Sequence, residues 1–173
     1  MTQKDLEGVA LLSVDPFLGD NAVRAAELAR ACNKTVFAIE LEPDHPLARY
    51  SDVVINSAGF MRRHKMGPAA DVADGLLKTG VETVVITQGK LGCLVFQKHA
   101  HSFEQPAFSV TAEDSTGAGD AFRAGLIYAY LQEWSLARCV QFASGCAALT
   151  CTKLGGAGHV HSEDQVFQCL AQT

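Results

Sequence analysis

The stretch Asp114-Ser115-Thr116-Gly117-Ala118-Gly119-Asp120-Ala121-Phe122 decides the fold, because a glycine-containing loop leads here directly into an apolar helix. The glycines leave the backbone bare, so an anion can approach its N–H groups closely. A helix that begins here directs unpaired N–H groups and its positive dipole end toward the loop, which favours a bound phosphate. Asp120 would lie in the first helical turn, where its carboxylate could accept the proton of a hydroxyl that attacks this phosphate.

The same residues are also compatible with a purely structural turn. An aspartate in the first turn stabilises a helix without any further role, and Gly-x-Gly before a helix is often only a tight turn. Two familiar nucleotide loops are excluded. No Gly-Lys-Ser/Thr follows a glycine loop, as a P-loop requires. The glycine after Gly119 is Gly125, so the dinucleotide spacing Gly-x-Gly-x-x-Gly fails and an oxidoreductase is a poor candidate.

Residues 114–122, followed by Ala124-Gly125, resemble the signature near the C-terminus of the ribokinase-like (PfkB) carbohydrate kinases. Two further motifs agree with this family in order and spacing. Residues 84–92 are similar to a strand that ends in Thr-x-Gly-x-x-Gly, and residues 142–149 with 155–158 are similar to a downstream helix and glycine loop. The resemblance covers essentially the whole chain, but only the C-terminal part of the family's domain.

This resemblance implies an ATP-dependent kinase that phosphorylates a sugar hydroxyl, with Asp120 as the catalytic base. It implies an anion hole formed by Gly117, Ala118 and Gly119. The residues expected to contact the nucleotide are Asn56, Thr87, Gly89, Gly92, Thr116 and Ser144. Asp114 is the candidate ligand of a monovalent cation such as K⁺, because in some family members its loop and the downstream glycine loop hold such an ion.

The expected magnesium environment departs from the family pattern. In the family, an Asn-x-x-Glu pattern associated with Mg²⁺ and phosphate follows a buried strand. The corresponding residues here are Asn56-Ser57-Ala58-Gly59, so a glycine stands in place of the glutamate. We therefore expect Mg²⁺ to be held less well than in the family.

The apolar pattern predicts an α/β fold with a mostly parallel, twisted sheet flanked by helices. Continuous apolar runs predict strands buried on both faces, and helical patterns between them imply parallel crossovers. The expected strands are 8–14, 35–39, 52–55, 83–87 and 93–96; the expected helices are about 20–33, 68–78, 120–133, 136–150 and one after Ser162. With the resemblance, this gives a three-layer ribokinase-like domain over residues 1–173 that lacks the family's N-terminal strands and lid.

Composition limits the other function classes. The chain has 173 residues, 48% of them hydrophobic and 19% charged, as in one ordinary globular domain. Its net charge of −5 argues against nucleic acid or an anionic membrane as a partner. No apolar run approaches a membrane span, and the start does not resemble a signal peptide, so a cytoplasmic location is expected. The six cysteines form no Cys-x-x-Cys pair and are expected to be reduced and buried.

Two functions stay open at this point. The first is a sugar kinase represented by its nucleotide-binding and catalytic-base part, with little or no activity by itself. The second is a non-catalytic nucleotide-binding or interaction module, either a truncated product or a subunit completed by another chain. In both cases the first strand is expected to expose an edge and apolar surface, which predicts a homo-oligomer.

Overall fold

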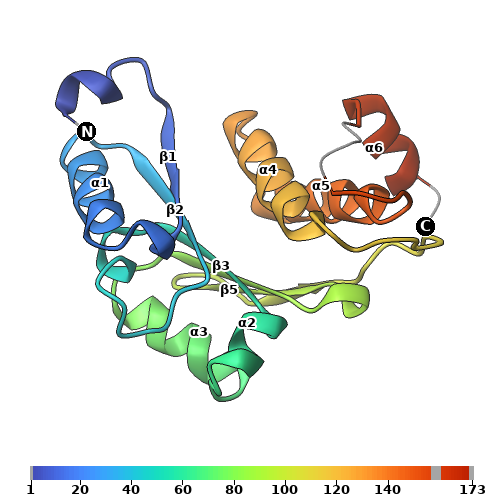
Figure 1. Ribbon diagram of the computed structural model, residues 1–173, viewed down its shortest axis with the longest axis horizontal. Coiled ribbons are helices and arrows are strands. Elements are labelled where there is room, and N and C mark those ends of the chain that lie inside the picture. The colour runs from blue at the N-terminus through green and yellow to red at the C-terminus, as the bar shows by residue number, and fades with distance from the viewer. Residues whose placement is uncertain (1, 157–160, 172–173) are drawn as a thin grey trace. The chain divides into compact units, whose positions relative to one another are not determined.

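The computed structural model describes residues 2–156 and 161–171, which form two compact units (Figure 1). Unit 1 comprises Met1–Gln88 and Leu94–Phe103, and unit 2 comprises Gly89–Cys93 and Glu104–Thr173. The expectation of a single domain over residues 1–173 stays a prediction.

A parallel sheet forms the centre of unit 1. Its strands are β1 (Leu11–Val14), β2 (Thr35–Ile39), β3 (Val53–Ser57) and β4 (Thr83–Thr87). Neighbouring strands pair in parallel from β1 to β4. The strand order continues through β5 (Cys93–Gln97) to β6 (Phe103–Gln105). The Lys98 N–H donates to the Glu82 carbonyl at 3.0 Å, so the end of β5 lies beside the start of β4. The mostly parallel sheet of the sequence prediction is therefore confirmed.

The helices of unit 1 follow from the spacing of their small and apolar residues. They are α1 (Asp20–Ala31), α2 (Ala58–Arg63) and α3 (Ala69–Lys78), with short 3₁₀ turns at Gln3–Leu6, Pro16–Leu18 and Ala48–Tyr50. Helix α1 buries a stripe of alanines at helical spacing, and α3 buries an aliphatic stripe. The core that these stripes share with the sheet includes Ala22, Ala26, Ala29, Val36, Val54, Val72, Leu76 and Val84.

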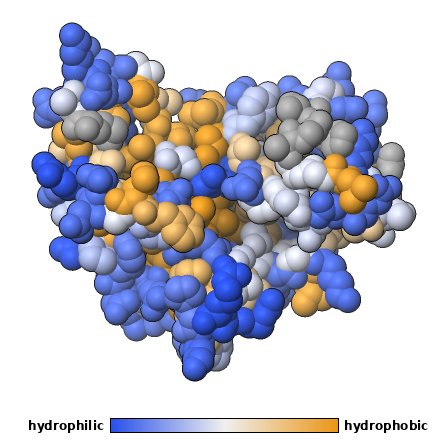
Figure 2. All heavy atoms as spheres, viewed as in Figure 1, coloured by the Kyte–Doolittle hydropathy of each residue, from blue (hydrophilic) through white to orange (hydrophobic). Residues whose placement is uncertain are grey.

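Strand β1 is less buried than its apolar sequence predicts. Residues 8–14 are expected to be buried on both faces, but the strand is limited to Leu11–Val14, and within it Val14 alone is fully buried. The reason is its place at the end of the strand order, with β2 as its neighbour. Apolar side chains accordingly reach the surface in the region of β1 (Figure 2).

Unit 2 is dominated by α4 (Ala118–Leu131), α5 (Leu136–Thr150) and α6 (Glu163–Leu170), with a short turn at Gly89–Leu91. Glycines allow close contact between these helices. A Cβ atom on Gly125 of α4 would lie 2.8 Å from the Cys146 Sγ atom of α5. A Cβ atom on Gly145 of α5 would lie 2.9 Å from Leu170 Cδ2 of α6. The small residues of α5 at positions 143, 145 and 146 therefore serve helix packing.

Within the described ranges, 2–156 and 161–171, no helix has the length and apolar character that a bilayer span requires.

Candidate functional site

The loop before α4 ends in a residue that has to be glycine. Gly117 is the N-cap of α4 and has a φ of +78°, in the left-handed region that favours glycine. Its carbonyl accepts the Ala121 N–H at 2.9 Å, which starts the helix. The Ala118 N–H already donates to the Ser115 carbonyl at 3.2 Å. The N–H groups of Gly119 and Asp120 have no intrahelical acceptor, so donor capacity remains at these two residues.

This first turn is open to solvent. A Cβ atom on Gly119 would meet no other heavy atom within 4 Å. The Asp120 side chain is 78% exposed, and its Oδ1 atom lies 3.3 Å from Nη2 of Arg123, one turn further along α4. An anion can therefore reach the backbone at Gly119 with a carboxylate beside it.

A second glycine loop packs against the first. A Cβ atom on Gly117 would lie 2.6 Å from the Gly156 carbonyl oxygen, and one on Gly156 would lie 2.6 Å from the Thr116 carbonyl oxygen. The two backbones therefore touch in a way that a larger residue at either position would prevent. This contact holds Gly117 in place at the start of α4.

Asp114 closes the loop through both carboxylate oxygens. Oδ1 accepts the Thr116 N–H at 2.9 Å and the Thr116 hydroxyl at 2.7 Å. Oδ2 accepts the Gly155 N–H at 3.0 Å, which ties the two loops together. These bonds, first the backbone N–H of Thr116, then its hydroxyl, then Gly155, lower the pKa of the Asp114 carboxyl. The predicted cation would have to share these oxygens, and the rest of the expected cation loop, 157–160, lies outside the described residues.

The two glycines of the predicted Thr-x-Gly-x-x-Gly turn differ in their surroundings. Gly89 has a φ of +60° and nothing within 4 Å of its Cβ position. Gly92 has a φ of +95°, and a Cβ atom there would lie 2.0 Å from the Gln105 carbonyl oxygen. Gly92 is thus required by packing, whereas the surroundings of Gly89 leave room for a ligand.

Ser144 faces the interior of unit 2. It is buried, and its hydroxyl hydrogen-bonds the Cys93 thiol of β5. Burial raises the pKa of Cys93 to about 11, and the Ser144 hydrogen bond opposes this shift only in part. Ser144 therefore has a packing role beside the nucleotide contact that the resemblance implies.

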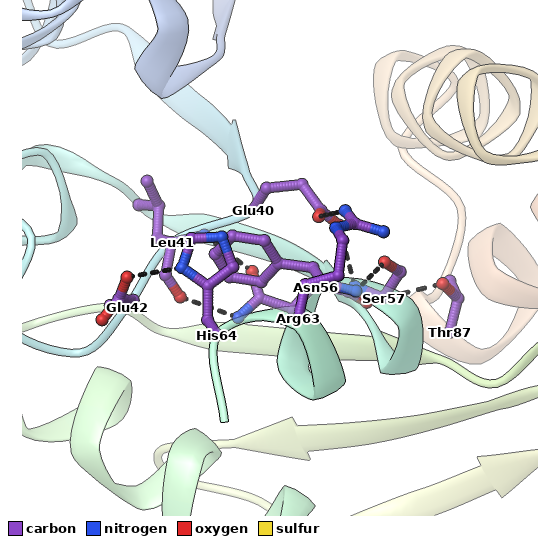
Figure 3. A network of polar contacts seen from close by, with 9 residues as sticks. Glu40, Leu41, Glu42, Asn56, Ser57, Arg63, His64 and Thr87 are labelled. Carbon is purple, nitrogen blue, oxygen red and sulfur yellow. Dashed lines mark hydrogen bonds and ion pairs between the residues drawn. The ribbon is translucent and has the colours of Figure 1, made fainter. Parts of the chain in front are cut away.

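Polar side chains form a network in unit 1, where β2 and β3 end (Figure 3). Asn56 is fully buried, and its amide accepts the Leu41 N–H at 2.9 Å and donates to the Leu41 carbonyl at 2.8 Å. The backbone carbonyl of Asn56 accepts a hydrogen bond from the Thr87 hydroxyl at 3.4 Å. Glu40 accepts the Ser57 N–H at 3.0 Å. Asn56 thus fixes the segment after β2, at the sheet edge where α/β folds bind ligands.

A cationic side chain lies beside Gly59, the position at which the family pattern has a glutamate. The Cβ position of Gly59 is 3.5 Å from Nη1 of Arg63, an ordinary van der Waals distance to a side chain that is 69% exposed. The nearby Glu40 carboxylate is itself 3.4 Å from Nη2 of Arg63. In the part of the chain that the structure describes, no group of three or more His, Cys, Asp or Glu could hold a metal ion.

Comparison with known proteins identifies the family. Residues 54–162, more than half of the chain, match the pfkB family of carbohydrate kinases. The chain belongs to the pfkB family. The resemblance of residues 114–122 to the family signature therefore reflects membership of the family. These residues, α4 and α5 all fall inside the matched range.

Relatives of this pfkB chain are sugar kinases. It is 34% identical to a ribokinase of Haemophilus influenzae over 53% of this chain and 29% of the relative. It is 31% identical to fructokinase-1 of Zea mays over 58% of this chain and 33% of the relative. The matched parts therefore span about a third of these curated relatives.

A solved structure confirms the fold. The structure of Arabidopsis thaliana ribokinase complexed with ribose and ATP aligns with a TM-score of 0.84 over 98% of this chain and 59% of that one, at 19% sequence identity. The ribokinase-like α/β class that the sequence predicts is thus correct.

Each unit of the pfkB chain contains part of the predicted site. Unit 2 brings Asp114, Thr116 and residues 117–120 together around the start of α4, and also contains Gly89, Gly92 and Ser144. Unit 1 joins Asn56 to Thr87. Sequence reasoning named neither Glu40, which accepts the Ser57 N–H, nor Arg123, which pairs with Asp120. The available signals were a carboxylate directly after a buried strand, and a cation three residues after Asp120 on one helix face.

Proposed function

We propose that this chain is the nucleotide-binding and base-supplying part of an ATP-dependent carbohydrate kinase, which transfers the γ-phosphoryl group to a sugar hydroxyl. One observation carries this proposal: the exposed Asp120 carboxylate stands in the first turn of α4, beside the open backbone at Gly119. Membership of the pfkB family supports the same reaction class.

The reaction needs positioning and charge stabilisation more than covalent help from the protein. The N–H groups of Gly117, Ala118 and Gly119 and the positive end of α4 would stabilise negative charge on the γ-phosphoryl group. Asp120 would accept the proton of the sugar hydroxyl. The sugar oxygen would then bond to the γ-phosphorus while the bond from phosphorus to the ADP oxygen breaks.

The nucleotide contacts are proposed in two groups. Gly89 and Thr116 are exposed or have open space around them, which supports direct contact with ATP. Asn56, Gly92 and Ser144 already have packing or hydrogen-bonding roles, so we assign them to shaping the site. Thr87, at the end of β4, is the remaining proposed nucleotide contact. Asp114 is proposed as a ligand of K⁺ alongside the loop bonds that it already makes.

A non-catalytic nucleotide-binding module is the second candidate. It is favoured by Gly59, which stands where the family pattern has a glutamate, since a kinase of this reaction class uses a metal ion to neutralise phosphate charge. We expect weak nucleotide binding and very low sugar kinase activity from this chain by itself. We also propose a cytoplasmic location, which the six unpaired cysteines support, and self-association through the apolar surface around β1.

Replacement of the base tests the proposal. Asp120→Asn should lower phosphoryl transfer to a sugar by about 10²- to 10⁴-fold, because a general base typically contributes that much. The affinity for ATP, measured by fluorescent-nucleotide titration, should survive. The assay follows ADP release over a panel of sugars. Normal turnover by Asp120→Asn would refute the assignment of the base, and ATP binding without transfer to any sugar would favour the second candidate.

A further inference from the structure

Arg123 is a cationic side chain beside the proposed base, and the reaction outlined above gives it no role. Its Nη2 atom lies 3.3 Å from Asp120 Oδ1. The two residues are three apart on α4 and share one helix face. The Arg123 side chain is 27% exposed, whereas that of Asp120 is 78% exposed. The arginine side chain is thus partly buried, and its guanidinium meets a carboxylate that is largely exposed to solvent.

The direction of the side chain brings the guanidinium close to the proposed anion hole. Side chains on an α-helix tilt toward its N-terminus, so Arg123 reaches back over the first turn of α4. That turn is where Gly119 leaves the backbone open. A guanidinium presents several N–H donors in a planar fork that matches the oxygens of a phosphate.

We propose that Arg123 binds the phosphoryl group that is transferred, in exchange for the ion pair that it makes with Asp120 in the absence of ATP. The inference rests on the proposed function, and it adds a residue that contacts the substrate. A γ-phosphate at the start of α4 draws the guanidinium from the carboxylate to the phosphate oxygens.

The exchange has two consequences for the reaction. It adds a positive charge where the oxygens of the transferred group gather negative charge, which stabilises the transition state. It also frees the Asp120 carboxylate to accept the proton of the hydroxyl. Arg123 itself neither gains nor loses a proton, because a guanidinium stays protonated in proteins.

The exposure of the ion pair permits this exchange. Water screens a pair whose carboxylate is 78% exposed, so the pair contributes little stability and opens readily. A γ-phosphate carries more negative charge than one carboxylate and therefore competes well for the guanidinium. A purely structural role, as an i,i+3 pair on a helix surface, would make no distinction between nucleotides with and without this phosphate.

Calorimetric titration of ATP and ADP distinguishes the two roles. Arg123→Met should weaken ATP binding about tenfold, the effect expected for loss of a charge-assisted hydrogen bond, and change ADP binding less than twofold. Arg123→Lys should fall between, because an ammonium lacks the planar fork. Arg24→Met is the matched control, since Arg24 is an exposed helix arginine of unit 1; it should change neither affinity.

Asp120→Asn gives an independent test in a chain that retains Arg123. Removal of the carboxylate should tighten ATP binding, and this gain should be smaller when Arg123→Met is also present. Thermal melting identifies any variant that does not fold. If Arg123→Met does not fold, the test is made with Arg123→Lys and Asp120→Asn. Equal losses of ATP and ADP affinity in Arg123→Met, or no loss of either, would overturn the inference about Arg123 and leave the proposed function standing. Failure of the unsubstituted chain to bind either nucleotide would overturn the proposed function as well.

Discussion

The two glycines at the start of α4 differ in the space around them, and this difference separates binding from folding. Gly119 has nothing within 4 Å of its Cβ position. Gly119→Ala should therefore leave the fold intact and raise stability by up to about 1 kcal/mol, as Gly-to-Ala changes in helices do. The added methyl group should obstruct a phosphate and weaken ATP binding several-fold. Melting curves and ATP titration check both expectations, and unchanged ATP affinity would argue against an anion at this turn.

Gly117→Ala is expected to behave in the opposite way. Its φ of +78° strains any other residue, and the new methyl group would lie 2.6 Å from the Gly156 carbonyl oxygen. We expect a loss of about 1–3 kcal/mol in the free energy of unfolding, measured by denaturant titration. A fully stable Gly117→Ala protein would show that the loops 114–117 and 155–156 are not packed as described.

Asp114 makes the link between these loops dependent on pH. Its pKa is lowered in the folded chain, chiefly by the Thr116 N–H, so it binds its proton less readily than in the unfolded chain. Its contribution to stability is therefore fully present above the ordinary aspartate value of 3.8 and is lost as the pH falls through the lowered pKa. Acid titration followed by NMR at the Gly155 amide should show the loss of its hydrogen bond to Asp114 below pH 3.8. Asp114→Asn should remove this titration step. A loss well above pH 3.8 would contradict the assignment.

At the scale of elements, the contact between α4 and α5 depends on the absence of a side chain at Gly125. A Cβ atom there would lie 2.8 Å from Cys146 Sγ and 3.1 Å from the Ala143 Cα atom. Gly125→Leu should therefore lower the free energy of unfolding by about 1–3 kcal/mol through overpacking. Ala124→Leu is the matched control, because Ala124 is exposed on the same helix. Thermal unfolding compares the two, and equal stability of both variants would contradict this packing.

Helix α2 offers a way to restore the carboxylate that the family pattern contains. Gly59 is in the first turn of α2, where an acidic side chain interacts favourably with the helix dipole and with Arg63. Gly59→Glu should raise stability by about 1 kcal/mol and make ATP binding more dependent on Mg²⁺. Gly59→Gln is the neutral control. If calorimetry with and without Mg²⁺ gave the same result for all three proteins, position 59 would have no part in metal binding.

At the scale of the whole molecule, the sequence predicts those features that are encoded locally. The start of α4 follows from glycines before a long apolar run, and the burial of β2 to β4 follows from continuous apolar residues. Strand β1 has a similar apolar run but ends the strand order, and no local pattern reports which strand has a single neighbour. The surroundings of Ser144 and Arg123 depend likewise on partners and side-chain directions that only the folded chain defines.

The most direct test of the account is an amide NMR titration of the chain with ATP. The account predicts that the largest shift changes fall on the N–H groups of residues 117–120, because the γ-phosphate would meet the start of α4 there. The same titration with ADP should give smaller changes at these amides. Changes confined to other residues, with those of 117–120 unaffected by saturating ATP, would contradict the claim that this helix end holds the transferable phosphoryl group.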